Sequence, residues 1–392
     1  MKILIVAFTF PPNKDGVSDA AAAMTRGFTA RGWEVDVLTE ITTPARESML
    51  WNNARIHEYT HTGGNSPDII LREQGTSYAD FLLAGSWDVL IFHAYGPHLQ
   101  LALPVMERIR GKKFLVSHGY AALMWVRTNR FPFGLVYWMK SVIASFRMPA
   151  WLGRFDRTIY LSEQSDLFGF YDHFIAKACS YAGARVIPNG VDLAERGANP
   201  EGFRQQHGIP RDAFLFVCVA NYSRRKDQGY GARAFRKAAI PGSVLVFIGS
   251  DFNIYSQAFQ AADEQQRGSN PPGTIIWLEK QSRSSTLDAL AACDAFVLSA
   301  NHEAQPIALL EAMREGKPWI ARKAGCIERM EGGLCVTSEQ AMADAMVRLS
   351  SDGALRDRLS REGAEAVSLR YDRNTYMDSY CKLVEELAPD AV

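Results

Sequence analysis

Two glutamates separated by seven residues are the feature of this sequence with the clearest chemical use. Glu303 lies in the loop after the apolar run 295–299, and Glu311 lies in a predicted helix that begins at Ile307. Carboxylates accept hydrogen bonds from vicinal hydroxyls, and the start of a helix offers backbone N–H donors and a favourable dipole for phosphate. One short segment therefore has the groups needed to hold both a sugar and a diphosphate.

A cationic loop is the second candidate. Arg224, Arg225 and Lys226 follow the apolar run 214–220. Cations at the carboxyl end of a strand neutralise a leaving diphosphate, whose charge develops as a sugar–phosphate bond breaks. We expect Lys226 to do this, and a solvated charged loop is the alternative.

The N-terminal half offers a histidine and a glycine. His118 follows the run 113–117, where an imidazole can donate to a sugar hydroxyl or stabilise developing charge. Gly16 ends the loop after the first apolar run, and its lack of a β-carbon lets the backbone approach a phosphate or an acceptor closely. We interpret the nearby His93 and His98 as structural.

The elements that position these residues repeat twice along the chain. Short apolar runs without alternation are separated by helical stretches, which is typical of parallel sheets covered on both faces. These runs are 2–10, 35–39, 87–93 and 113–118, then 214–220, 244–249, 274–278 and 295–299. The predicted fold class is α/β, with two Rossmann-like βα domains facing across a cleft, where open α/β folds bind ligands.

The segment from Glu303 to Glu311, continuing Ala-Met and later Gly316-Lys317-Pro318, resembles the donor-site signature of the family-four retaining glycosyltransferases. The resemblance covers nearly the whole chain and implies the glycosyltransferase B fold. It also implies that Glu303 contacts hydroxyls of the donor sugar, that Glu311 binds the nucleotide ribose, and that Ile307 is donor-binding. Ala-Gln-Pro stands at 304–306 where the family more often has Gly-Phe-Gly.

The same resemblance assigns the remaining site residues. The Lys226 loop is similar to a family loop whose Arg and Lys hold the diphosphate, but Asn221 replaces that Arg, so Arg224 or Arg225 takes its place. A family histidine at the position of His118 approaches the donor sugar. Gly16 matches one of two family glycines, and Gly325 lies in a turn that resembles the one closing the donor pocket.

The resemblance also implies a division of labour. Residues 1–195 are expected to bind the acceptor and residues 196–372 the nucleotide sugar. Residues 373–392 contain Tyr376, Tyr380, Leu383 and Leu387 at helical intervals, so we expect a helix that packs back on the N-terminal domain.

The expected function is metal-independent transfer of a sugar from a UDP- or GDP-linked donor to a hydroxyl, and the resemblance alone implies that the transfer is retaining. We expect a glycan or lipid-linked acceptor in surface polysaccharide or glycolipid assembly, and no cofactor. No Asp-x-Asp follows a strand as a metal site requires. Two alternatives remain: a non-catalytic nucleotide-sugar-binding protein, and a nicotinamide-dependent oxidoreductase, which needs Gly-x-Gly-x-x-Gly where only Gly16 is present.

Net charge and composition limit the classes of partner that the protein can have. Lys plus Arg and Asp plus Glu both total 43, so no global field favours nucleic acid. The first apolar run is too short for a signal sequence, which predicts a cytoplasmic protein. Residues 125–157 mix basic and aromatic side chains, with no Asp or Glu between 125 and 155. They form either a peripheral contact with the inner face of the membrane or a helical insertion that packs its aromatics inward.

Overall fold

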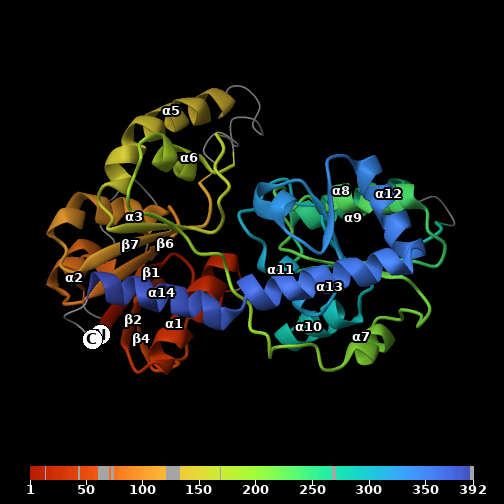
Figure 1. Cartoon of the computed structure of the whole chain (residues 1–392), viewed down its shortest axis with the longest axis horizontal. Coiled ribbons are helices and arrows are strands. Elements are labelled where there is room, and N and C mark those ends of the chain that lie inside the picture. The colour runs from red at the N-terminus through yellow and green to blue at the C-terminus, as the bar shows by residue number, and fades with distance from the viewer. Residues whose placement is uncertain are drawn as a thin grey trace. The chain divides into compact units, whose positions relative to one another are not determined.

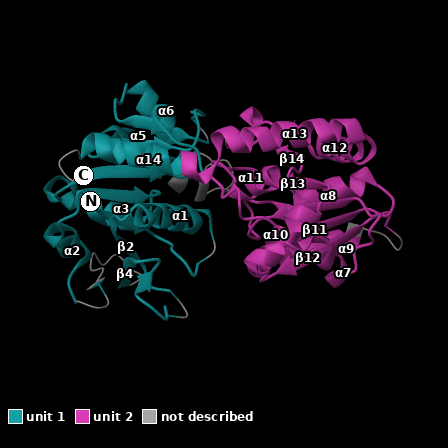
Figure 2. Cartoon of the chain, turned by 60° about the horizontal axis from the view of Figure 1, so that its bottom comes forward, with its two compact units in different colours: residues 1–189, 376–392 teal, residues 190–375 magenta. Residues whose placement is uncertain are grey.

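The chain folds into two compact units. The computed structural model describes residues 1–13, 15–42, 45–60, 70–71, 75–120, 133–167, 169–266 and 271–388. The first unit comprises Met1–Asn189 with Tyr376–Val392, and the second comprises Gly190–Thr375 (Figure 2). Each unit is built on its own largely parallel sheet with helices between the strands, which confirms the predicted α/β class.

The sheet of the first unit has nine strands among the described residues, in the order β3-β4-β2-β1-β6-β7-β8-β9 with β5 paired to β4. Only β3 and β5 are antiparallel to their partner there. The residues of β1 from Ile3 to Ala7 are fully buried, as expected for a strand covered on both faces. The strands are β1 (Lys2–Ala7), β2 (Glu34–Glu40), β3 (Leu50–Trp51), β4 (Ala54–Thr60), β5 (Ile70–Leu71), β6 (Val89–His93), β7 (Lys112–Ser117), β8 (Arg157–Tyr160) and β9 (Ala184–Val186).

The helices of the first unit include the C-terminal helix (Figure 1). They are α1 (Gly16–Ala30), α2 (Tyr78–Ala84), α3 (Pro97–Ala102), η1 (Leu103–Arg108), α5 (Phe133–Leu152), α6 (Tyr171–Ala178) and α14 (Arg373–Leu387), whose first turn belongs to the second unit. Helix α14 packs closely on α1 at Gly27. A β-carbon there would lie only 2.4 Å from Met377 Cε, so glycine is what allows the close approach. Arg31 of the α1 C-cap also pairs with Asp378.

The alanine-rich run 20–31 predicts a helix, and helix α1 begins four residues before that run, at Gly16. Asp15 is its N-cap, and the Asp15 carboxylate accepts hydrogen bonds from Val17 N at 2.9 Å and Ser18 N at 3.0 Å. Such a cap satisfies N–H groups that have no partner within the helix. Gly16 is therefore the first residue of α1 rather than the end of a loop.

The second unit has six parallel strands among its described residues, in the order β12-β11-β10-β13-β14-β15. The strand order reverses between β10 and β13, so the loops after these two strands open at the carboxyl edge where doubly wound sheets bind ligands. The strands are β10 (Leu215–Val219), β11 (Val244–Gly249), β12 (Thr274–Glu279), β13 (Ala295–Leu298), β14 (Trp319–Arg322) and β15 (Gly333–Val336). The helices are α7 (Pro200–Gln206), α8 (Gln228–Ala238), α9 (Ile254–Gln266), α10 (Arg283–Ala292), α11 (Ile307–Arg314), η2 (Gly325–Arg329), α12 (Glu339–Ser351) and α13 (Gly353–Arg370).

Helix α5 presents apolar side chains to solvent. Its large exposed apolar residues, at helical spacing, are Leu135, Trp138, Met139, Ile143 and Phe146. Its last turn is different, because Met148 and Leu152 are buried and pack with Tyr160 and Tyr171. None of the helices in the described part of the chain combines the length and apolarity that a bilayer span requires. Trp125, Arg127, Arg130 and Phe131 lie outside the described residues.

Candidate donor site

The loops after β10 and β13 are tied together by hydrogen bonds. The two strands are direct neighbours in the sheet. Ser299 Oγ donates to the carbonyl of Lys226 at 3.0 Å, and Asn301 N donates to the carbonyl of Arg225 at 3.0 Å. These bonds fix the cationic loop against the loop that carries Glu303, although 77 residues separate Lys226 from Glu303.

Lys226 and Glu303 form an ion pair at this strand edge. Their side chains are 17% and 7% exposed, so the pair is largely shielded from water. Burial raises the pKa of the Cys326 thiol to about 12, and the negative charge of Glu303 adds to the rise. Gly325, the neighbour of Cys326, has φ of 56°, a left-handed conformation that glycine adopts without strain.

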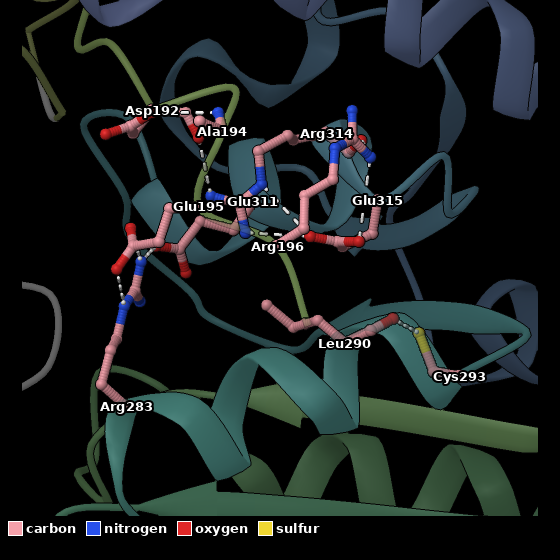
Figure 3. Close-up of polar contacts among 10 residues, drawn as sticks. All are labelled: Asp192, Ala194, Glu195, Arg196, Arg283, Leu290, Cys293, Glu311, Arg314 and Glu315. Carbon is pink, nitrogen blue, oxygen red and sulfur yellow. Dashed lines mark hydrogen bonds and ion pairs between the residues drawn. The ribbon is translucent and has the colours of Figure 1, made fainter. Parts of the chain in front are cut away.

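Glu311 is held by an arginine from the neighbouring helix. It lies in the second turn of α11, is buried, and accepts a bond from Arg283 Nη2 at the start of α10. The same guanidinium donates to Glu195 through Nε at 3.1 Å and Nη2 at 2.8 Å. Figure 3 shows the Arg283 side chain reaching both carboxylates. Bonding to Arg283 lowers the pKa of Glu195 below its usual range.

The first turn of α11 has no side-chain cap. Its N-cap is Pro306, which makes no side-chain capping bond, and Ile307 is the first helical residue. Backbone N–H groups at an uncapped helix start are suited to an anion. This is the arrangement that the sequence predicted for the segment from Glu303 to Glu311.

Arg224 and Arg225 are both exposed on the same loop as Lys226. Asn301 Nδ2 donates to the carbonyl of Arg224 at 3.2 Å. The Arg225 guanidinium makes no hydrogen bond or ion pair with any described residue. It is therefore available to an anionic ligand.

His118 and Gly16 lie in the first unit, each directly after a strand or its loop. His118 follows β7, and its Nε2 is 3.2 Å from Nδ1 of His93, the last residue of β6. Burial lowers the pKa of His118 to about 4, and the charge of Asp15 opposes this shift. His118 is therefore neutral near pH 7, a form whose ring can both donate and accept hydrogen bonds. A β-carbon at Gly16 would meet no atom within 4 Å, so its backbone is open to approach.

Sequence reasoning missed three residues of these clusters. His93, interpreted from the sequence as structural, is fully buried, and the adjacent ends of β6 and β7 bring it against His118. The presence of a histidine at both strand ends was the available signal. No sequence signal pointed to Arg283 or Glu195, because 88 residues separate them and only the fold brings them to Glu311.

The comparisons with known proteins identify the second unit. Residues 200–366 match the family model for glycosyl transferases group 1. The second unit therefore carries a group 1 glycosyl transferase domain. This match confirms the resemblance drawn from the Glu303–Glu311 motif, and Lys226, Arg283, Glu303 and Glu311 all lie within the matched part of the glycosyl transferase domain.

Curated relatives of this chain are distant. The chain is 28% identical over 193 residues to the lipopolysaccharide core biosynthesis glycosyltransferase LpsD of Rhizobium meliloti. The aligned part covers 45% of this chain and 50% of the relative. The chain is 27% identical over 212 residues to the phosphatidyl-myo-inositol mannosyltransferase of Mycobacterium leprae, covering 52% and 53%. The chain thus spans about half the length of the curated relatives it matches.

Solved structures match the whole chain in fold. Sucrose-phosphate synthase from Thermosynechococcus elongatus has a TM-score of 0.77 at 18% identity and covers 98% of both chains. Anabaena Alr3699/HepE in complex with UDP and glucose has a TM-score of 0.74 at 16% identity, covering 98% of this chain and 100% of that one. At these identities the likeness establishes the fold, and it confirms the predicted glycosyltransferase B type.

Proposed function

We propose that this protein transfers a sugar, with retention, from a UDP- or GDP-linked donor to a hydroxyl acceptor. The observation that carries the proposal is the Lys226–Glu303 pair at the strand reversal of a group 1 glycosyl transferase domain. Such an edge binds ligands in doubly wound sheets, and both residues are held there by bonds between their loops.

The proposed roles follow from the chemistry of each group. Lys226, with Arg224 or Arg225, neutralises the leaving diphosphate, so the reaction needs no resident metal ion. Glu303 accepts hydrogen bonds from the donor sugar, and Glu311 accepts one from the ribose. The departing phosphate takes the proton of the acceptor hydroxyl.

The remaining site residues receive supporting roles. His118 hydrogen-bonds to a sugar hydroxyl, the backbone at Gly16 approaches the acceptor or a phosphate, and Ile307 offers its N–H to the diphosphate. The turn at Gly325 closes the donor pocket. In this account the first unit binds the acceptor and the second binds the nucleotide sugar.

We also propose that the acceptor is lipid-linked and reached at the inner face of a membrane. The exposed apolar face of α5 supports this, since a free-standing protein surface rarely keeps such a stripe. Arg147 is exposed on the same helix, and the sequence has no acidic residue from 125 to 154. An apolar face with only positive charges beside it suits an anionic lipid surface.

A panel of nucleotide sugars tests the donor assignment. Each donor is added to the purified protein and the melting temperature is recorded, because a ligand at 100 times its dissociation constant stabilises by about 2.7 kcal/mol. We expect one UDP- or GDP-linked sugar to raise the melting temperature with EDTA present. Stabilisation by none of them would contradict the proposal. Stabilisation without any donor hydrolysis would favour the non-catalytic alternative.

A further inference from the structure

Arg283 and Glu311 place a hydrogen-bond donor directly beside a hydrogen-bond acceptor. Glu311 uses Oε1 to accept from Arg283 Nη2, and Oε2 has no bond to any described residue. Arg283 uses Nε and Nη2 for Glu195 and Glu311, and its Nη1 group has no bond within the described chain either. The Arg283 side chain is 46% exposed, so Nη1 is within reach of a ligand.

A vicinal diol matches this pair better than a carboxylate alone. Each hydroxyl both donates and accepts, so one can donate to a carboxylate while the other accepts from a guanidinium. Bonds to charged groups are also about twice as strong as neutral ones. The ribose of a nucleotide carries such a diol at its 2′ and 3′ positions.

We infer that Arg283 is a second ribose-binding residue. Its Nη1 donates a hydrogen bond to one ribose hydroxyl, while Glu311 Oε2 accepts one from the other. The inference rests on the proposed function, because it takes the ligand of Glu311 to be a nucleotide. It adds a hydrogen-bond donor to the ribose site and predicts selectivity for ribose over deoxyribose at both the 2′ and the 3′ position.

Glu195 acts as a positioning residue for Arg283. It holds the guanidinium through two bonds, of 3.1 and 2.8 Å, which fixes the plane of the fork. Three bonds to two carboxylates leave Nη1 as the part of the guanidinium directed at neither of them. Lysine cannot reproduce this arrangement, since a single ammonium group lacks the planar fork.

The test measures binding of UDP and GDP, and of their 2′-deoxy and 3′-deoxy analogues, by calorimetry. The variants are Glu311→Gln, Arg283→Lys, Arg283→Met and Glu195→Gln. Arg358→Lys is the matched control, because Arg358 forms an exposed ion pair with Glu362 in the same unit. Arg283→Lys keeps the positive charge, so it reports on the site even if Arg283→Met fails to fold.

We expect the wild-type protein to bind each deoxy analogue roughly 10- to 100-fold more weakly than the ribonucleotide. Glu311→Gln should lose this discrimination at one hydroxyl, and Arg283→Lys at the other. Glu195→Gln should show the same pattern as Arg283→Lys in weaker form, and Arg358→Lys should match the wild type. Full discrimination at both positions in Arg283→Lys would overturn the inference alone. If the wild type binds neither UDP nor GDP, the proposed function itself fails.

Discussion

The ammonium group of Lys226 is paired with the carboxylate of Glu303 across the carboxyl ends of β10 and β13. Both side chains are largely buried, so each charge depends on the other for compensation. The pair keeps a cation and a carboxylate in fixed positions where the proposed diphosphate and donor sugar bind. Electrostatic catalysis requires such groups to be in place before the reaction begins.

Breaking this pair from one side should destabilise the second unit. Lys226→Met leaves the Glu303 charge buried without a partner, which costs about 3 kcal/mol. The double variant Lys226→Met/Glu303→Gln should recover most of that loss, because no charge is left unpaired. Urea unfolding of the two single variants and the double variant measures the coupling. Additive losses would mean that the two side chains do not depend on each other.

Glu311→Gln should weaken binding of the nucleoside diphosphate. The ribose loses a charged acceptor, and the expected penalty is roughly 1.5 to 3 kcal/mol. Titration calorimetry with the nucleotide that binds the wild type provides the number. Glu362→Gln, which neutralises an exposed carboxylate of the same unit, is the control. Unchanged affinity in folded Glu311→Gln would remove Glu311 from the ribose site.

Exposed apolar residues of α5 should determine vesicle binding. Trp138→Ser/Phe146→Ser should weaken binding to vesicles of phosphatidylcholine with phosphatidylglycerol, because less apolar surface enters the interface. Binding should also fall with salt, since each nearby cation contributes on the order of 1 kcal/mol at an anionic surface. Ile254→Ser removes an exposed apolar residue from the second unit and is the control. Equal sedimentation of wild type with neutral and anionic vesicles at low salt would eliminate the membrane proposal.

Acid should destabilise the first unit through its buried histidines. Burial lowers the pKa of His98 to about 4, while its Nε2 donates to the carbonyl of His93 at 2.9 Å. Between pH 6.5 and 4 the unfolded chain therefore binds a proton that the folded chain does not, and stability falls as pH falls. His98→Gln keeps a donor for that carbonyl but does not titrate.

Thermal melts at pH 6.5 and 5.5 give the comparison for His98. For an unfolded pKa near 6.5, wild type should lose about 1 kcal/mol more than His98→Gln over this interval, or a few degrees of melting temperature. Identical losses in the two proteins would show that His98 takes up no extra proton on unfolding.

The sequence was sufficient for eight of the strands, but it missed β4, β8, β14 and β15 among others and did not show which strands are neighbours. Runs such as 244–249 were long, apolar and bounded by turn residues, so β11 was predicted with its observed ends. The start of α1 was missed because the capping bonds of Asp15 weigh more than the alanine run that follows. The pairing of Lys226 with Glu303 depends on β10 and β13 being neighbours, which is a property of strand order rather than of either segment.

The contact between Arg283 and Glu311 could not be predicted from the sequence. Arg283 occupies the first turn of α10, where a cation is unfavourable to the helix dipole, and only two carboxylates from elsewhere in the chain explain it. His93 was accessible in principle, since two histidines at the ends of consecutive strands meet whenever those strands are adjacent.

The most direct test of the account is release of nucleoside diphosphate from the donor that stabilises the protein, compared between wild type and Lys226→Ala. Leaving-group charge grows toward the transition state, so turnover should fall about 100-fold or more while donor affinity falls less than about tenfold. Lys226→Arg should restore little of the turnover. Equal losses of turnover and affinity, or wild-type release by Lys226→Ala, would contradict the role of Lys226 at the reacting diphosphate.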